Sequence, residues 1–405
     1  MSLGGADVAW ASDPIGAMSA NPAGLGSLVG PQLNLGGVGG ILVGHYDKPG
    51  VSSGNLNETP NGVPTFALGA PLAKSPITLG FSVDPDSALL ADWHYRDAPG
   101  GLGGATTYGF QQHESSITVL RAAIGAAAKL SQKLTVGMSV GLIYNENRLI
   151  APYVFQNLQP PTVNGAKALI NLHTVGTSWD YQVGLMYHFT TNLQFGLSYK
   201  GQASVTTTGH ASGDPYAQFG KPPGVLAFQY DASVKNKFPQ ELSGGLSWQF
   251  APQWRGAVQM DWINWAGAFD SLLMSFSHGN NATVNSVLGS SFRDTVQLHW
   301  RDEIVYRAGL EYAITTNLSL RCGYSYGNNP VPSSTLTPMT AAIMEQAVSA
   351  GIGYQVGRYD FSLAYEYDLP KKESIGISGL RSGEYSNSSV TVSAHLLAVT
   401  AGVKF

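Results

Sequence analysis

The chain has 405 residues and a formal net charge of −4, and only 12% of its residues are charged. That charged share is about half of what soluble domains carry, and the negative balance argues against nucleic acid as a partner. The single cysteine, Cys322, excludes an internal disulfide framework and any cysteine-rich metal site. No run approaches the roughly 18 to 20 apolar residues of a membrane helix. No spacing typical of metal ligands occurs, and we expect no cofactor.

Residues 1–30 show no strand pattern. They are rich in glycine, alanine and serine, and they contain the segment Asn21-Pro22-Ala23-Gly24-Leu25. By composition alone, this part of the chain fits a disordered tail.

From Gln32 onward, apolar and polar residues alternate in short segments. The clearest case lies between Trp300 and Tyr326, where one face of each strand is apolar or aromatic and the other is mostly polar. Side chains of a strand point to opposite faces with period two, so each segment predicts a two-faced strand. The predicted strands cover residues 32–46, 62–72, 77–83, 116–130, 134–146, 174–188, 193–205, 239–250, 254–265, two strands within 296–326, 347–356, 359–368 and 389–405.

These segments give fourteen strands, and their connections alternate between turns of a few residues and long loops. Short turns on one side and long loops on the other are typical of outer-membrane β-barrels. We therefore predict an all-β fold, in which residues 31–405 form a fourteen-stranded transmembrane antiparallel β-barrel of the bacterial outer membrane. Such a protein needs a secretory signal, which we expect to have been removed. A soluble two-sheet sandwich is the alternative.

Several short motifs are spread over essentially the whole chain. They are Gly4-Gly5-Ala6, Asp13-Pro14, Asn21-Pro22-Ala23-Gly24-Leu25, Phe238-Pro239, Leu242-Ser243-Gly244-Gly245-Leu246, Asp261-Trp262-Ile263-Asn264-Trp265, Trp300-Arg301-Asp302, Tyr306-Arg307-Ala308-Gly309-Leu310, Leu320-Arg321-Cys322-Gly323-Tyr324 and Pro330-Val331-Pro332. In this order and spacing they resemble the FadL-type family of outer-membrane transporters of long-chain fatty acids and aromatic hydrocarbons. The resemblance implies that residues 1–30 are a hatch inside the barrel, with Asn21, Pro22 and Ala23 in it, and not a disordered tail.

Residues 85–113 and 147–173 are unusually apolar for loops. An exposed apolar patch usually marks a binding surface, and in the resembled family these two loops form the groove where hydrophobic substrate first docks. The alternative is that their side chains form the loops' own small core. The predicted docking residues are Leu89, Leu90, Trp93, Leu149, Ile150, Tyr153 and Phe155.

A carboxylate cargo entering the lumen would need a cation to offset its desolvation. Arg301 is predicted on the inward face at the extracellular end of its strand, and Arg307 lies deeper on the same face. Arg148 matches a basic head-group position of the resembled family, although strand parity places it on the outer face beside Tyr144, so reaching the lumen would require a bulge. The alternative is that the lumen arginines pair with lumen acids such as Glu303.

The third strand, residues 77–83, is shorter than the roughly nine to eleven residues that span a membrane. Asp84-Pro85 should end it because proline cannot donate to the ladder, and Gly80 sits where a bulge or close approach is common. FadL-type proteins are understood to release substrate sideways at this strand. We predict a lateral gate at Gly80, Asp84 and Pro85, and the alternative is a merely short strand.

The resulting hypothesis is a non-enzymatic, passive uptake channel for hydrophobic small molecules, gated by the hatch. The alternatives are a polar-solute porin and an outer-membrane barrel lipase, for which no histidine shows a companion Ser and Asp pattern. We expect a monomer that contacts outer-membrane lipid and lipopolysaccharide. The terminal Phe405 resembles the signal read by the barrel assembly machinery.

Overall fold

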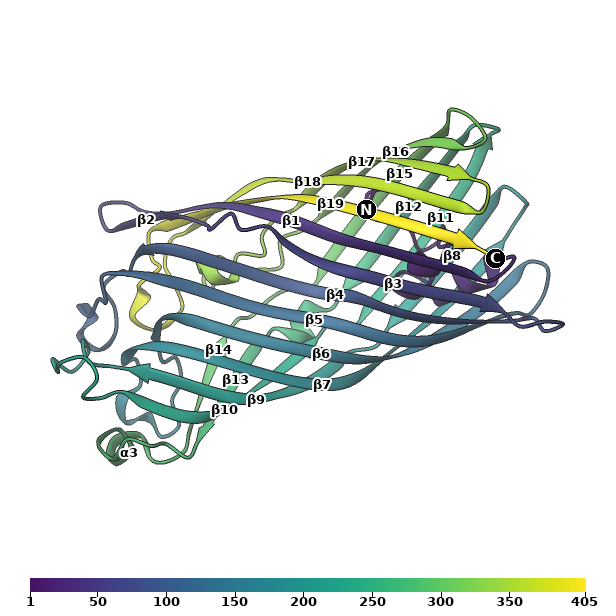
Figure 1. Cartoon of the computed structure of the whole chain (residues 1–405). Helices are drawn as coiled ribbons and strands as arrows, with labels where there is room; N and C mark the ends of the chain where they lie inside the picture. Colours follow the sequence, from purple (N-terminus) through teal and green to yellow (C-terminus); the bar gives the residue numbers. More distant parts are fainter.

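The first and last strands, β1 (Gln32–Lys48) and β19 (Ser388–Lys404), pair antiparallel from Gln32↔Lys404 to Asp47↔Ser389. This pairing closes one continuous sheet into a barrel in the computed structural model, which describes residues 1–405 (Figure 1). Closure leaves no unpaired first or last strand, as a sheet surrounded by lipid requires.

Four barrel strands are each interrupted near mid-length, so that each appears as two consecutive strands. The halves are β8 (Leu193–Lys200) and β9 (Ala203–Asp214), β10 (Phe228–Phe238) and β11 (Glu241–Ala251), β12 (Trp254–Ile263) and β13 (Ser271–Ser277), and β14 (Phe292–Gln297) and β15 (Glu303–Ala313). Besides β1 and β19, the uninterrupted strands are β3 (Asn61–Pro71), β4 (Ile77–Arg96), β5 (Phe110–Lys129), β6 (Leu134–Val154), β7 (Lys167–His188), β16 (Leu318–Gly327), β17 (Gln346–Val356) and β18 (Tyr359–Ile375).

With the halves joined and the short loop strand β2 (Ser52–Asn55) set aside, the barrel has fourteen strands, which confirms the predicted count. The helical segments are short and are not part of the wall. They are α1 (Pro14–Ser19), η1 (Pro22–Ser27), η2 (Leu102–Gly104), η3 (Pro161–Val163), α2 (Trp265–Ala268), α3 (Ala282–Leu288), η4 (Pro338–Thr340) and η5 (Arg381–Gly383). None of these helices has the length and apolar character needed to cross a membrane.

Tight turns gather at one end of the barrel and long loops at the other, right and left in Figure 1. Between the ends, large apolar side chains cover the outside, for example Val140 and Leu142 on β6 and Leu363 and Tyr365 on β18, all exposed. Several of their inward-facing strand neighbours are small or polar, among them Ser139, Gly141 and Ser362. An apolar band of this extent is stable only against lipid.

Strand β4 continues through residues that were expected to end it. It pairs with β5 from Ile77 to Arg96, with a register shift between Pro85 and Ser87. The bulge has one extra residue, Asp86, and allows the ladder to continue past Pro85, which has no backbone N–H to donate. The prediction of a short third strand was therefore wrong, and much of the predicted loop 85–113 is strand. The predicted loop 147–173 is likewise partly strand, in β6 and β7.

The N-terminal segment lies against the inward face of the wall, near the end with the tight turns (Figure 1). Asn21 begins η1, and its Oδ1 accepts a hydrogen bond from the backbone N–H of Ala23 at 3.1 Å. The same side chain donates through Nδ2 to the carbonyl oxygens of Val8 at 2.8 Å and of Leu185, on β7, at 3.1 Å. One asparagine therefore caps η1 and ties it to the wall.

Two wall glycines make room for η1. A Cβ placed on Gly137 would lie 2.4 Å from the backbone N of Ala23, and one on Gly184 would meet the Asn21 side chain. Both contacts are closer than a side chain can tolerate, so the backbones of wall and N-terminal segment approach only because glycine occupies these positions.

Candidate functional site

A cavity of about 260 Å³ lies inside the barrel toward the end with the long loops. Of its 38 lining residues 26 are hydrophobic, and the lining comes from β1, β4, β5, β6, β7, β10, β13, β14 and β19 and from loops between strands. The residues of the N-terminal segment do not line it. An apolar, enclosed site with few polar groups is typical of a small-molecule binding pocket.

Aromatic side chains give part of the cavity wall its shape. Trp93, on β4, is fully buried, and its Nε1 donates to the carbonyl oxygen of Pro338 at 3.0 Å. This bond fastens the strand to the loop that covers the cavity. Phe269 and Trp300 stack with their ring centroids 4.9 Å apart, and Trp265 meets Trp300 edge-on at 5.3 Å. Such aromatic pairs hold their rings in fixed orientations.

Five of the seven predicted docking residues line this cavity, and two do not. Ile150 lies outside the lining, and Phe155 is buried in a separate core, where it packs against Tyr153 and Phe292. Phe155 therefore belongs to a small core of its own, which was the alternative to a docking role. The predicted docking residues that line the cavity are Leu89, Leu90, Trp93, Leu149 and Tyr153.

Arg301 is exposed and lies outside the cavity lining, while its neighbour Trp300 lines the cavity. The expected inward orientation of Arg301 rested on unbroken strand parity. Residues 298–302 interrupt the wall between β14 and β15, and His299 has a φ of 51°. Parity does not continue through this break, so we do not retain Arg301 as a head-group ligand.

Arg148 borders the cavity, but its side chain is 51% exposed and its Nε lies 3.2 Å from Glu114 Oε1. Pairing of β6 with β5 and with β7 runs through Arg148 without a register shift. No bulge turns the residue inward, and Leu149 takes the cavity side. Strand parity therefore holds here, and Arg148 is not placed to meet a ligand head group in the lumen.

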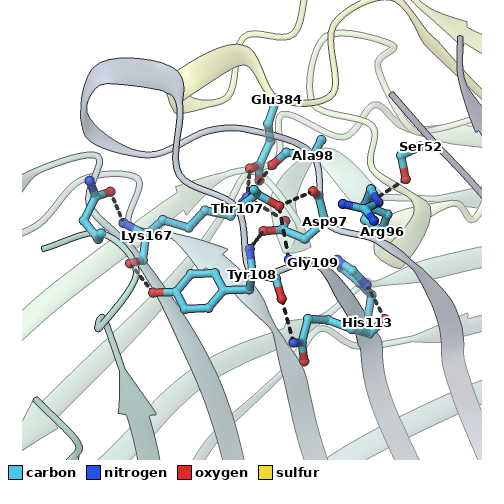
Figure 2. Close-up of polar contacts among 12 residues, drawn as sticks. Ser52, Arg96, Asp97, Ala98, Thr107, Tyr108, Gly109, His113, Lys167 and Glu384 are labelled. Atoms are coloured by element: carbon cyan, nitrogen blue, oxygen red, sulfur yellow. Dashed lines mark hydrogen bonds and ion pairs between the residues drawn. The ribbon is translucent and has the colours of Figure 1, made fainter. Parts of the chain in front are cut away.

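The loops around the cavity are joined by a buried ionic cluster that the sequence did not indicate. Figure 2 shows the side chain of Lys167, at the start of β7, pointing between Asp97, Ala98 and Glu384. Its Nζ donates to Asp97 Oδ1 at 2.6 Å, to the carbonyl oxygen of Ala98 at 2.7 Å and to Glu384 Oε2 at 2.7 Å. Lys48 Nζ donates to the backbone carbonyl oxygen of Glu384 at 2.6 Å.

Burial shapes the electrostatics of this cluster. It raises the pKa of the Glu384 carboxyl to about 7, and the attraction of Lys167 offsets only part of that rise. Burial also raises the pKa of Asp97, against the opposing effect of Lys167. Glu384 and Tyr385 both line the cavity, whereas Lys167 and Asp97 do not. The cluster therefore presents an acid, and no cation, to the cavity.

The wall is incompletely paired beside the cavity. Strand β3 pairs with β4 only from Phe66↔Val83 to Pro71↔Thr78. Beyond Val83, no strand ladder forms on that side of β4, and contact resumes with the bridge between Leu56 and Trp93. Asp84 and Pro85, two of the predicted gate residues, begin this unpaired stretch. The exposed Ala88 lies within it and also lines the cavity.

Gly80, the third predicted gate residue, lies below this stretch and faces the N-terminal segment. A Cβ on Gly80 would meet Leu25 Cδ1 and Met18 Sδ, each at 2.8 Å. A larger residue here would have to displace the Leu25 and Met18 side chains of η1 and α1, and the unpaired edge begins further along the strand.

Two ion pairs in the lumen lie against the N-terminal segment. Arg121 Nε is 2.7 Å from Asp180 Oδ2, and both side chains are buried. Arg307 Nε is 2.5 Å from Asp261 Oδ2, and its Nη1 donates to the carbonyl oxygen of Gly4 at 3.3 Å. Arg307 thus pairs with an acid in the lumen. This pairing is the alternative to a role in ligand binding.

Residues 2–405 match the profile of a protein family described as outer membrane protein transport protein (OMPP1/FadL/TodX). The chain belongs to this family. Because it belongs to the OMPP1/FadL/TodX family and its outer wall is apolar, it is a bacterial outer-membrane β-barrel that transports hydrophobic compounds. Among curated proteins no sequence matches the chain.

Solved structures of similar proteins share the fold of this OMPP1/FadL/TodX member. The Pseudomonas putida toluene transporter TodX is 22% identical, with 96% of this chain and 93% of that chain covered and a TM-score of 0.76. A Pseudomonas aeruginosa FadL homologue is 14% identical, with coverage of 100% and 97% and a TM-score of 0.77. The Ralstonia pickettii toluene transporter TbuX is 19% identical, with coverage of 96% and 93% and a TM-score of 0.71.

Proposed function

We propose that the protein is a passive uptake channel whose apolar cavity receives hydrophobic small molecules from the extracellular side, without catalysis. The observation that carries the proposal is the cavity itself, which is apolar and roofed by the long loops. A water-filled porin would instead need a polar channel through the barrel. Transfer of an apolar molecule from water into the cavity is favourable, so a concentration gradient is sufficient to drive entry.

We also propose that residues 1–30 act as the hatch that closes the lumen below the cavity. The support is the set of contacts that bind this segment to the wall, among them Asn21 to Leu185 and Gly4 to Ser349 Oγ at 3.0 Å. On the far side of the segment lies a more polar cavity of about 660 Å³, with only 12 hydrophobic residues among its 35 lining residues. A hydrophobic cargo gains nothing by entering that space.

Lateral release into the membrane is the exit that we propose. The unpaired edge of β4 after Val83 supports this route, because Ala88 on that edge is exposed and lines the cavity. Leu42 of β1 and Leu56 line the cavity on the opposite side of the same stretch. A cargo leaving between β3 and β4 would pass from an apolar cavity to lipid without crossing water.

The test is uptake of radiolabelled toluene by cells that express the wild-type protein or Ala88→Trp. The indole should obstruct the unpaired edge, and uptake should fall severalfold at equal surface expression. Ala308→Trp is the matched control, because Ala308 is exposed on β15, on the opposite side of the barrel from β4, and uptake should be unchanged. Normal uptake by Ala88→Trp would exclude this exit. Entry of small sugars, with no gain in toluene uptake, would favour a porin instead.

For assembly, we propose recognition of the terminal Phe405 by the barrel assembly machinery. Its side chain is 69% exposed at the turn end of β19, so it is available to a partner. Pairing of β1 with β19 closes the barrel and leaves neither terminal strand free for a second copy to extend, which supports a monomer in contact with outer-membrane lipid and lipopolysaccharide.

A further inference from the structure

The charges that border the cavity set a limit on the cargo, and the reasoning rests on the proposed uptake function. Among arginine, lysine, aspartate and glutamate side chains, only Arg148 and Glu384 border it. Arg148 is turned to the outer face and paired with Glu114, as described above. The acid is therefore the charged group that faces the bound molecule.

Lys167 cannot serve an anionic cargo. An ammonium group has three N–H donors, and Lys167 Nζ already has three acceptors, on Asp97, Ala98 and Glu384. The side chain is fully buried. A carboxylate in the cavity could be paired with Lys167 only after displacing one of these partners, which would leave that partner buried and unpaired.

Lys48 is similarly engaged. Its Nζ donates to the backbone carbonyl oxygens of Glu384 and Ser386, at 2.6 and 2.7 Å, and Lys48 does not line the cavity. Around Glu384 the charged neighbours are thus Lys48, Lys167 and Asp97, and all three lie behind the cavity wall. A bound carboxylate would face Glu384 across the cavity with no free cation to offset its charge. Each of the two carboxylates would be destabilised by burial and by the negative charge of the other.

We infer that the cavity takes uncharged hydrophobic molecules and rejects carboxylates such as fatty-acid anions, and that Glu384 is the side chain that enforces this selection. Hydrocarbons and neutral alcohols are compatible with the lining. A hydroxyl group can also donate to Glu384 Oε1, which forms no hydrogen bond within the protein. The established property of the family is transport of hydrophobic compounds, and the choice between neutral and anionic cargo is specific to these residues.

The experiment compares ligands that differ only in charge. Binding of p-xylene and of 4-methylbenzoate to the purified barrel is measured by calorimetry at pH 8, after subtraction of partition into empty detergent micelles. The carboxylate should bind at least about a hundredfold more weakly, because a buried charge without a partner is strongly disfavoured. Equal affinity would overturn the inference and leave the uptake function standing. Failure of p-xylene to bind would overturn the proposed function itself.

Two further measurements assign the selection to Glu384. In Glu384→Gln the ratio of the two affinities should move toward unity by at least about tenfold, because the repelling charge is gone. Glu345→Gln is the matched control: Glu345 also pairs with a lysine, Lys371 at 2.9 Å, but it does not line the cavity, and the ratio should not change. An unchanged ratio in Glu384→Gln would overturn the role of this residue.

If Glu384→Gln does not fold, the wild-type protein still provides a test through pH. Lowering the pH from 8 to 4 protonates both the ligand and Glu384, so binding of 4-methylbenzoate should strengthen while binding of p-xylene changes little. Carboxylate binding that is independent of pH would contradict the selection.

Discussion

Replacement of Lys167 by methionine removes the cation that is hydrogen-bonded to both carboxylates of the buried cluster. The change deletes three hydrogen bonds, to Asp97 Oδ1 at 2.6 Å and to Ala98 and Glu384 at 2.7 Å. Methionine fills a similar volume, so the effect is mainly electrostatic. Two carboxyl groups, both buried, would then face each other without compensation.

Breaking a buried pair by removal of one partner costs about 3 to 5 kcal/mol. Here that cost falls on the contact between the loop after β4 and the loop before β19, so local opening of these loops should rise by about two to three and a half orders of magnitude. At pH 8 the full cost applies. At pH 5 Glu384 is mostly neutral, so the two carboxyl groups no longer repel each other as charges and the effect should be much smaller.

In the wild-type protein, the pKa of Glu384 determines whether the stability of these loops rises or falls with pH. The pKa of Glu384 is about 7 in the folded protein, against 4.5 ordinarily, so the folded loops bind more protons between these values. Its contribution to loop stability is therefore greatest below pH 4.5 and declines as the pH rises through 7.

Hydrogen exchange of peptides covering residues 97–109 and 376–387 measures this opening directly. The ratio of exchange rates, Lys167→Met over wild type, should be large at pH 8 and should shrink at pH 5. Lys133→Met, in a turn at the opposite end, is the control for the loss of one lysine. A ratio near one at pH 8, or a ratio that grows toward pH 5, would refute the reasoning.

Three other substitutions probe the lumen and the wall. Asn21→Ala should weaken the hold of η1 on Leu185 by about 1 kcal/mol and raise the ion conductance of the protein in planar bilayers, because the cap and the tie are both lost; unchanged conductance would mean that this contact does not hold the lumen closed. Arg121→Met should lower the urea midpoint of barrel unfolding by leaving the buried Asp180 unpaired, a loss of about 3 to 5 kcal/mol; an unchanged midpoint would show that this ion pair does not stabilise the barrel. Arg301→Ala should leave binding of p-xylene and of 4-methylbenzoate within about twofold of wild type, since exposed side chains away from a site contribute little; a selective loss of carboxylate binding would restore Arg301 as a head-group ligand.

The fourteen strands were predictable because lipid outside the barrel imposes a strict two-residue alternation. Above the lipid this constraint ends, so the alternation could not show how far β4, β6 and β7 continue. Pro85 was read as the end of a strand, but the bulge at Asp86 removes the need for its missing N–H. A bulge depends on both neighbours and has no signature in one strand alone.

The cavity wall was partly predictable, because apolar residues such as Leu89 and Leu149 stood in segments that were expected to be exposed. The ionic cluster was not, since Lys167 is 70 residues from Asp97 and 217 from Glu384 along the chain. Nothing local distinguishes these residues from solvated loop charges. A fully buried lysine becomes visible only when the loops that cover it are placed in space.

The contacts of the N-terminal segment determine when it can fold. Gly4 bonds to Ser349, 345 residues later, and a Cβ on Gly323 would collide with Gly4, so this binding surface exists only once β16 and β17 are in place. Contacts so distant in sequence form late, because their loop-closure entropy must be offset first. Residues 1–30 can therefore reach their native position only after the C-terminal part of the wall has formed. Until then they are not held by the wall, and the closing barrel has to enclose them.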